Sequence, residues 1–283
     1  MLPITPDILD LIDRALAEDL AYQDATTAAL IPPDQNGTAV ILSKADGVLA
    51  GVGLAYAVFQ RADSSLNGEA LLEDGAVLRP NDRIFLVRGP LRGILRAERT
   101  ALNFLQRLSG IASETARYVR AVEGLPVQII DTRKTVPGHR YLDKYAVRLG
   151  GGHNHRLNLA DGILMKDNHI AALKARGATL KEAVRQALAH APHTLKVEVE
   201  VESVEEAAEA LDGGCHIILL DNMGLEDMAT AAAMSKGRAL TEASGGINLT
   251  TVRAVAETGV DLISVGALTH SVSALDISLE LQV

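Results

Sequence analysis

The part of the chain that follows Val127 alternates short apolar runs with amphipathic helical segments, at a period of roughly 20–25 residues. Capping boxes at residues 179–182 and 203–206 mark the start of two of these helices. Serial strand–helix units predict a parallel sheet wrapped by helices. No dinucleotide-type glycine fingerprint opens any unit, which favours a barrel over a doubly wound sheet. Because only six strands can be placed, we expect an open, incomplete α/β barrel, with strands at residues 127–131, 162–166, 195–201, 216–221, 239–243 and 261–266.

The sequence before the barrel follows a different residue pattern. Residues 37–89 place short β-branched runs between Gly, Asn and Asp turns, around one helical piece at residues 53–61. This pattern predicts a smaller α+β domain of the sandwich type with a partly antiparallel sheet. We expect this N-terminal domain to cover residues 1–110 and to be joined by the C-terminal residues 272–283, whose alternation is strand-like. The catalytic barrel is then expected over residues 111–271.

Three further segments outside the barrel have a readable pattern. Residues 5–20 have the apolar spacing of an amphipathic helix, and residues 17–33 read as a loop closed by Pro32-Pro33. Residues 93–124 predict one long helix that joins the two domains, with room for a break near Ser109-Gly110. A polar stripe on this helix, which faces either water or a partner subunit, is made by Arg99, Asn103 and Arg107.

Bulk composition excludes several classes of protein. The formal net charge is -9, aromatic residues make up 3% and Trp is absent, which argues against a nucleic-acid binder. The single Cys215 cannot form an intramolecular disulfide and is expected to be a small buried residue in a reducing cytosol. The first twenty residues lack a signal-peptide pattern, and the longest uncharged apolar stretch, 47–60, is too short to span a bilayer. We expect a cytoplasmic protein with no membrane or nucleic-acid partner.

Positive charge is concentrated in one stretch, Asp131–Ile170, although the chain as a whole is acidic. Cations gathered in this way predict a pocket for an anionic small molecule, and a solvated basic loop is the alternative. The glycines at 150–152 are expected to let backbone approach a ligand. Zinc binding by His153 and His155 is another alternative, which the flanking cations disfavour. The charged members of the stretch are Arg133, Lys134, Arg140, Lys144, Arg148, Arg156 and Lys166, with histidines at His139, His153, His155 and His169.

Nearly every expected barrel strand ends in a polar residue, and in α/β barrels these ends carry the active site. Alternation within residues 197–201 turns Glu198 and Glu200 toward the barrel interior, with Glu200 nearer the mouth. Asp221 closes the next strand and lies on the same side of it as Ile217 and Leu219. Two acids above a cationic floor can hold a divalent metal or sugar hydroxyls, or can simply pair with Lys166 and Arg133. The strand-end residues are Asp131, Arg133, Lys166, Asp167, Glu200, Asp221, Ser244 and Gly266.

Glycine-bearing loops follow the last two expected strands. Residues 244–248 lead into a helix expected to begin at Leu249 with Asn248 as its cap, and residues 266–270 follow the final strand. Loops in these positions bind a phosphate monoester in many barrels. Simple turns are the alternative, but beside so many cations we favour a phosphate site.

Motifs along essentially the whole chain resemble those of the quinolinate phosphoribosyltransferase family of NAD biosynthesis. The resemblance implies an N-terminal α/β domain beside an open barrel, usually in a homodimer whose active sites are each completed by the other subunit. It is carried by ERTALNFLQRLSGIA (98–112), the 131–170 stretch, VEVEVES (197–203), ILLDNM (218–223), SGGI (244–247) and GVDLISVGALTHS (259–271).

The resemblance also implies a reaction, in which phosphoribosyl pyrophosphate (PRPP) and quinolinate react with Mg²⁺ to give nicotinate mononucleotide, pyrophosphate and CO₂. Arg133, His155 and Arg156 would hold the quinolinate carboxylates, and Arg99 would arrive from the partner subunit. Lys134 and Lys166 would hold the pyrophosphate or the pyridine carboxylate. Glu200 and Asp221 would serve the ribose hydroxyls and, indirectly, the Mg²⁺ that accompanies PRPP. The catalytic set is then Lys134, Lys166, Glu200 and Asp221, and the 5′-phosphate would lie at Ser244, Gly245, Gly246, Gly266 and His270.

Other functions share parts of this pattern. A paralogous group linked to molybdenum uptake has the same fold, but retention of Arg133, His155, Arg156 and the KDNHI segment at 166–170 favours the quinolinate enzyme. A barrel aldolase would use Lys166 as a Schiff base. A non-catalytic sugar-phosphate binder would hold PRPP without turnover. Departures from the family pattern are Ala21 and Gln23 in place of glycines and His139 in place of a leucine.

Overall fold

A computed structural model gives the structure of the protein and describes residues 2–282. The chain divides into two compact units. The N-terminal unit holds the residues up to 116, residues 136–151 and the residues from 272 on. The barrel unit holds residues 117–135 and 152–271. The domain boundaries expected at 110/111 and 271/272 stay a prediction.

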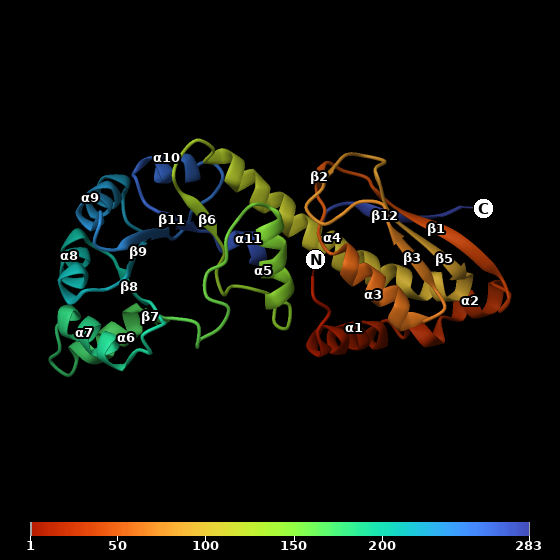
Figure 1. Ribbon diagram of the computed structural model, residues 1–283, viewed down its shortest axis with the longest axis horizontal. Helices are drawn as coiled ribbons and strands as arrows, with labels where there is room; N and C mark the ends of the chain where they lie inside the picture. Colours follow the sequence, from red (N-terminus) through yellow and green to blue (C-terminus); the bar gives the residue numbers. More distant parts are fainter. Residues whose placement is uncertain (1, 283) are drawn as a thin grey trace. The chain divides into compact units, whose positions relative to one another are not determined.

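The N-terminal unit is built on an antiparallel sheet of four strands in the order β12-β1-β5-β3. The C-terminal strand β12 pairs with β1 along its length, so the last residues of the chain complete the sheet of the N-terminal unit (Figure 1). Phe59 and Phe85 stack between the sheet and helix α3 (Val52–Ala62), with ring centroids 6.0 Å apart. The strands of this unit are β1 (Asn36–Ser43), β2 (Gly47–Val48), β3 (Asn67–Ala70), β4 (Val77–Leu78), β5 (Arg83–Pro90) and β12 (Ile277–Gln282).

The helices of this unit follow the sequence patterns, except that two short helical elements lie in a segment that was expected to be a loop. Helix α1 (Pro6–Glu18) buries Ile8, Ile12 and Leu16 as the apolar spacing predicts, and α3 (Val52–Ala62) covers the sheet. The segment expected to be a loop instead contains a short 3-10 turn (Ala21–Gln23) and α2 (Ala25–Leu30). Asp24 begins α2 by accepting a hydrogen bond from the Thr27 backbone N–H at 2.9 Å, a capping signal that the loop interpretation missed.

The long helix predicted near the middle of the chain is α4 (Leu91–Ala121), which runs without a break. The break expected near Ser109-Gly110 was wrong because these small residues serve packing. Ser109 Oγ accepts a hydrogen bond from the Ala50 backbone N–H at 3.0 Å, and a side chain at Gly110 would collide with the Ser273 carbonyl. Small residues therefore let neighbouring backbone approach the helix closely.

Gly150 has a comparable role at the end of α5 (Arg140–Leu149), which belongs to the N-terminal unit. A Cβ at this position would collide with the Ala112 carbonyl and lie 2.6 Å from Thr115 Cβ, both on α4. The expectation that the glycines of residues 150–152 admit a ligand is therefore wrong for Gly150. It admits a neighbouring helix.

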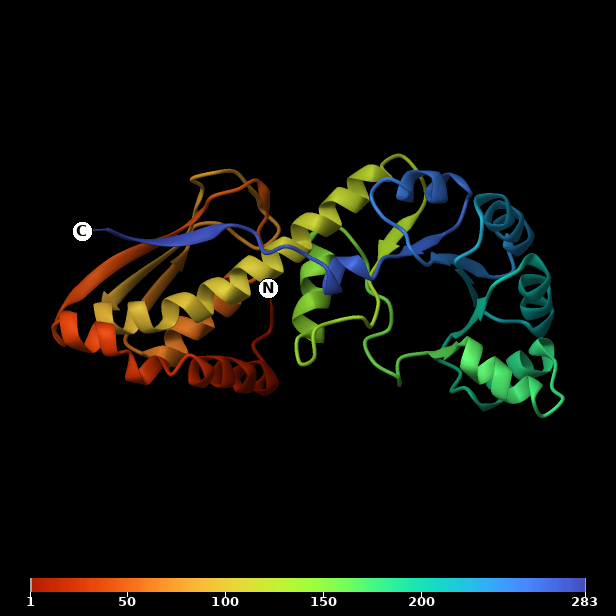
Figure 2. The same cartoon turned by 180° about the vertical axis from the view of Figure 1, so that it is seen from behind.

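The barrel unit is a six-stranded parallel sheet in the order β6-β11-β10-β9-β8-β7. Helices α6 to α10 lie outside the curved sheet, which does not close between β6 and β7 (Figures 1 and 2). An open α/β barrel after a smaller α+β domain confirms the expected fold class. All six expected strands are present, as β6 (Gln128–Ile130), β7 (Ile163–Met165), β8 (Val197–Val201), β9 (Ile217–Asp221), β10 (Leu240–Ser244) and β11 (Leu262–Ser264).

Short loops join these strands to the helices around them. Both predicted helix starts are correct, because Thr179 and Ser203 accept hydrogen bonds from the backbone N–H groups of Glu182 and Glu206. The capping box is complete only at Thr179, since the Glu206 carboxylate accepts from the Glu202 backbone N–H and not from that of Ser203. The helices are α6 (Asp167–Lys174), α7 (Leu180–His190), α8 (Val204–Gly213), α9 (Leu225–Ser235), α10 (Val252–Glu257) and α11 (Ala267–His270). Among residues 2–282 no helix has the length and apolar character needed to cross a bilayer.

Candidate active site

A cavity of about 560 Å³ lies at the carboxyl ends of the barrel strands. Its size is within the range of small-molecule sites. Four cations and three carboxylic acids line it, so opposite charges face each other inside one space. Of the residues predicted for the site, it brings together Arg133, Lys134, His155, Arg156, Lys166, Glu200, Asp221, Ser244, Gly245 and Gly246.

Lys166 and Glu200 form a direct ion pair at the mouth. Lys166 follows β7, Glu200 lies near the end of the neighbouring β8, and the Nζ–Oε2 distance is 3.2 Å. The Lys166 side chain is 49% exposed, so its ammonium stays open to a ligand. His169 Nδ1 accepts a hydrogen bond from the Lys166 backbone N–H at 3.0 Å, which fixes the start of α6. Of the ion pairs that the sequence left open, the one between Glu200 and Lys166 is therefore present.

Asp131 organises the segment that carries His155 and Arg156. Its carboxylate is fully buried and accepts from Asn154 Nδ2 at 2.6 Å and from the His155 backbone N–H at 2.9 Å. Arg156 Nη1 donates to the Gly162 carbonyl at 2.9 Å. Burial lowers the pKa of the Arg156 guanidinium, and the charge of Arg133 lowers it further. Two guanidinium groups held this close favour an anionic ligand between them.

The two glycine loops differ in their distance from the cavity. Gly245 and Gly246 line it and have φ angles of 99° and 60°, which L side chains rarely adopt. Helix α10 begins at Val252, three residues later than expected, because Asn248 forms a turn by accepting from the Thr250 backbone N–H at 2.9 Å. A six-residue helix that starts this late offers little dipole to a phosphate, so backbone N–H groups of the loop are the better donors.

Gly266 and His270 do not line the cavity but lie next to one of its cations. A Cβ on Gly266 would be 3.0 Å from Lys134 Cδ and 3.1 Å from His270 Nε2. Thr269 Oγ1 donates to the Lys134 carbonyl at 2.8 Å. The loop after β11 therefore holds the Lys134 backbone in place.

Beneath the mouth, one half-buried and two buried groups form a floor that we define as His155, Glu198 and Glu242. His155 Nε2 is 3.2 Å from Glu198 Oε2 and 3.7 Å from Glu242 Oε2. Burial raises the pKa of Glu242 to about 8, and the charge of Glu198 adds to the rise. The three side chains offer ligand atoms within 4.8 Å of one another, a spacing that suits a metal ion. His153, the other half of the zinc alternative, is outside this set.

A second cavity of about 410 Å³ lies on the other side of this floor, at the amino ends of the strands. His155, Arg156 and Glu242 line both cavities, so the floor separates the mouth from this second space. Sequence reasoning missed Glu242 and Asn222 as lining residues of the mouth. Strand parity offered a signal for Glu242, because it lies two residues before Ser244 and thus faces the same side.

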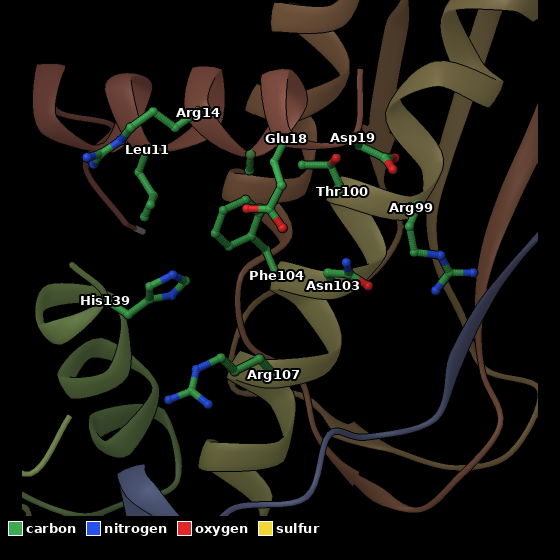
Figure 3. Close-up of a pocket in the computed structure, with 11 residues that line it drawn as sticks. Leu11, Arg14, Glu18, Asp19, Arg99, Thr100, Asn103, Phe104, Arg107 and His139 are labelled. Carbon is green, nitrogen blue, oxygen red and sulfur yellow. The ribbon is translucent and has the colours of Figure 1, made fainter. Parts of the chain in front are cut away.

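Arg99 lies in the N-terminal unit and lines a different cavity, of about 380 Å³, near α1 and α4. Figure 3 shows Arg99, Asn103 and Arg107 leaving successive turns of α4, as the sequence stripe predicts. Phe104 stacks on the His139 ring there, with centroids 5.8 Å apart. Burial lowers the pKa of His139, against the opposing charge of Asp143.

Comparison with known proteins decides the family. The model of the quinolinate phosphoribosyl transferase N-terminal domain matches residues 24–109, and that of the C-terminal domain matches residues 111–280. The chain belongs to this family.

Relatives and solved structures agree over nearly the full length. The chain is 44% identical to the nicotinate-nucleotide pyrophosphorylase [carboxylating] of Mycobacterium leprae, over 96% of each chain. It is 40% identical to a probable enzyme of the same name from Bacillus subtilis, over 95% of this chain and 92% of the relative. The crystal structure of NadC from Streptococcus pyogenes superimposes with a TM-score of 0.94 at 42% identity, covering 100% of this chain and 99% of that one.

Proposed function

We propose that the protein transfers the phosphoribosyl group of PRPP to quinolinate and releases nicotinate mononucleotide, pyrophosphate and CO₂. Membership of the quinolinate phosphoribosyltransferase family supports this reaction. The observation that carries it is the joint lining of one cavity by two guanidinium groups, two ammonium groups and two strand-end carboxylates. Such a cavity matches a doubly acidic ring and an activated sugar phosphate.

Charge distribution in the cavity suits glycosyl transfer. Departure of pyrophosphate leaves positive charge on the ribose, so carboxylates near the sugar and cations near the leaving group lower the barrier. Glu200 and Asp221 would provide the carboxylates, and Lys134 and Lys166 would hold the leaving pyrophosphate. Arg133 and Arg156 would bind the planar quinolinate carboxylates through paired N–H donors, with His155 beside them.

Decarboxylation then needs little chemistry from the protein. The glycosylated pyridine nitrogen is cationic and stabilises the carbanion that CO₂ leaves behind. The protein keeps the ring fixed by its carboxylate and excludes water. Ser244, Gly245 and Gly246 would receive the 5′-phosphate, and the loop with Gly266 and His270 would support it indirectly by holding Lys134.

Magnesium is part of this proposal. Glu200 and Asp221 offer carboxylate oxygens on neighbouring strands in the same cavity, the type of ligand that Mg²⁺ accepts. The ion would accompany PRPP and offset the negative charge of the pyrophosphate. Both residues remain able to contact ribose hydroxyls, so their link to the metal is indirect.

A homodimer in the cytoplasm completes the proposal, with Arg99 reaching the active site of the neighbouring subunit. The open polar stripe of Arg99, Asn103 and Arg107 beside a cavity supports it, and the single buried Cys215 fits a reducing compartment. Mixing Arg99→Ala with Lys166→Ala subunits tests it. If sites are shared, the mixture regains part of the activity that each inactive variant lacks. Two variants that stay inactive when mixed contradict the shared site.

One assay tests the reaction itself. The protein is incubated with quinolinate, PRPP and Mg²⁺, and nicotinate mononucleotide is measured. We expect product with quinolinate, little with nicotinate, and near-complete loss in Arg133→Ala, with exposed Lys236→Ala as the control. Full turnover in Arg133→Ala would remove that residue from the site. The Schiff-base alternative is disfavoured because Lys166 is ion-paired and half exposed, whereas such lysines are desolvated amines.

A further inference from the structure

The floor of the barrel contains two acids that the proposed chemistry does not use. Glu198 and Glu242 lie on β8 and β10, on either side of β9, and are 5% and 1% exposed. Their Oε1 atoms have no hydrogen-bond partner among the described residues. Burying two carboxylic acids this deeply costs folding free energy, so we expect them to have a function or a compensating charge.

The Oε2 atoms of both acids face the ring of His155. Its Nε2 atom is 3.2 Å from Glu198, and Nδ1 accepts the Arg156 backbone N–H at 2.7 Å. A ring that accepts at Nδ1 carries its proton at Nε2, so Nε2 donates to Glu198. The ring therefore connects the buried acid directly to the backbone of Arg156.

Charges near the floor fit this arrangement without a metal ion. The guanidinium of Arg156 is close enough to Glu198 for their charges to interact, and Arg133 is close to Arg156. Burial and Glu198 keep Glu242 largely protonated at neutral pH. The Arg156 guanidinium therefore supplies a positive charge within range of the buried acids, so the protein itself offers a compensating charge.

We infer that Glu198 is a positioning residue for the quinolinate site. Its carboxylate holds the His155 ring by accepting the hydrogen bond from Nε2, and the ring in turn holds Arg156. Glu242 is the third member of the floor, next to Glu198. The inference rests on the proposed function, because it assigns Arg156 and His155 to the quinolinate carboxylates. Glu198 itself lies below the mouth and lines the second cavity, so it acts through the ring. A small shift of Arg156 would weaken quinolinate binding and leave the PRPP contacts in place.

Kinetics of two Glu198 variants test the inference. Glu198→Leu has a similar shape but no acceptor, and should raise the KM for quinolinate about tenfold to a hundredfold, with less than about a twofold change for PRPP. Glu198→Gln keeps an acceptor oxygen and should recover most of the loss. Glu280→Gln, whose side chain lies half exposed on strand β12, is the matched control. Equal losses in the Gln and Leu variants, or a PRPP effect as large as the quinolinate effect, would overturn it.

A nitrogen-15 NMR measurement tests the same inference without turnover, so it remains informative if the proposed reaction fails. In the full-length protein the His155 ring, assigned by its loss in His155→Gln, should carry its proton at Nε2. Glu198→Leu should shift this signal, while the histidines away from the floor stay unchanged. A proton on Nδ1 in the unsubstituted protein would contradict the geometry. Stoichiometric binding of zinc or manganese that disappears in Glu198→Gln would also contradict the inference, because the floor would then be a metal site.

Discussion

Lys166 and Glu200 face each other from neighbouring strands, with the ammonium 3.2 Å from the carboxylate. The pair places the cation proposed for pyrophosphate next to the anion proposed for the ribose. Since both charges act on the same transition state, removing either should lower kcat by about a hundredfold to a thousandfold. Lys166→Ala and Glu200→Gln test this in a steady-state assay. A variant that keeps half of the unsubstituted rate would show that its group lies outside the chemistry.

Glu242 should make the stability of the protein depend on pH. Its pKa is raised from 4.5 to about 8 by burial and by Glu198, against the opposing effects of His155 and Ser264. A raised folded-state pKa means that the folded form binds the proton more tightly. The contribution of protonated Glu242 to the free energy of unfolding is therefore complete below pH 4.5 and is lost as the pH rises through about 8.

The measurement is the melting temperature from pH 5 to pH 9. Glu242→Gln mimics the protonated acid, so we expect its melting temperature to fall less than that of the unsubstituted protein across this range. Glu280→Gln, whose side chain is half exposed, should follow the unsubstituted curve. Parallel curves for Glu242→Gln and the unsubstituted protein would mean that Glu242 is ionised throughout.

Local periodicity was enough to predict the barrel strands and the direction of their side chains. Glu200 and Asp221 line the mouth because strands alternate their side chains, and parallel strands bring their carboxyl ends to one edge. The same reasoning placed Glu198 toward the interior. These features follow from spacing within a few residues, so a single sequence contains them.

Features that depend on distant contacts could not be predicted in the same way. Gly150 resembles a ligand-binding glycine in sequence, yet its neighbours are Ala112 and Thr115, more than thirty positions earlier. The link from Glu198 to Arg156 runs through the His155 ring and depends on how far the sheet curves. The expected break in α4 failed for the same reason, because the partner of Gly110 is Ser273.

Gly245 should not tolerate a side chain. Its φ of 99° is unfavourable for L residues, and a Cβ would collide with the side chain of Asn222. We expect Gly245→Ala to displace the loop and to raise the KM for PRPP at least about tenfold, because backbone strain and a clash each cost roughly 1–3 kcal/mol. Gly237→Ala is the control, since its φ of 76° is also positive but no atom lies within 4 Å of its Cβ position. A KM for PRPP in Gly245→Ala that is no higher than in Gly237→Ala would show that the loop at Gly245 does not bind PRPP or tolerates the added methyl group.

Arg107 and Asp143 should contribute to the stability of the N-terminal unit. The guanidinium contacts the carboxylate at 2.9 and 3.2 Å, and the Asp143 side chain is fully buried while Arg107 is 25% exposed. Burial raises the pKa of Asp143, and Arg107 opposes the rise. Arg107 therefore stabilises the charged form of a carboxylate that lies inside the protein. Removing the partner alone should lower the free energy of unfolding by about 3–5 kcal/mol.

Urea unfolding of Arg107→Ala measures this loss. Asp143→Asn added to Arg107→Ala should recover part of it, because the buried charge is then gone as well. Glu257→Ala breaks an exposed pair with Arg253, where both side chains are about half exposed, and should cost at most about 1 kcal/mol. The contrast between a buried and an exposed pair isolates burial as the cause. If Arg107→Ala unfolds at the same urea concentration as Glu257→Ala, the Asp143 carboxylate must find another partner when Arg107 is absent.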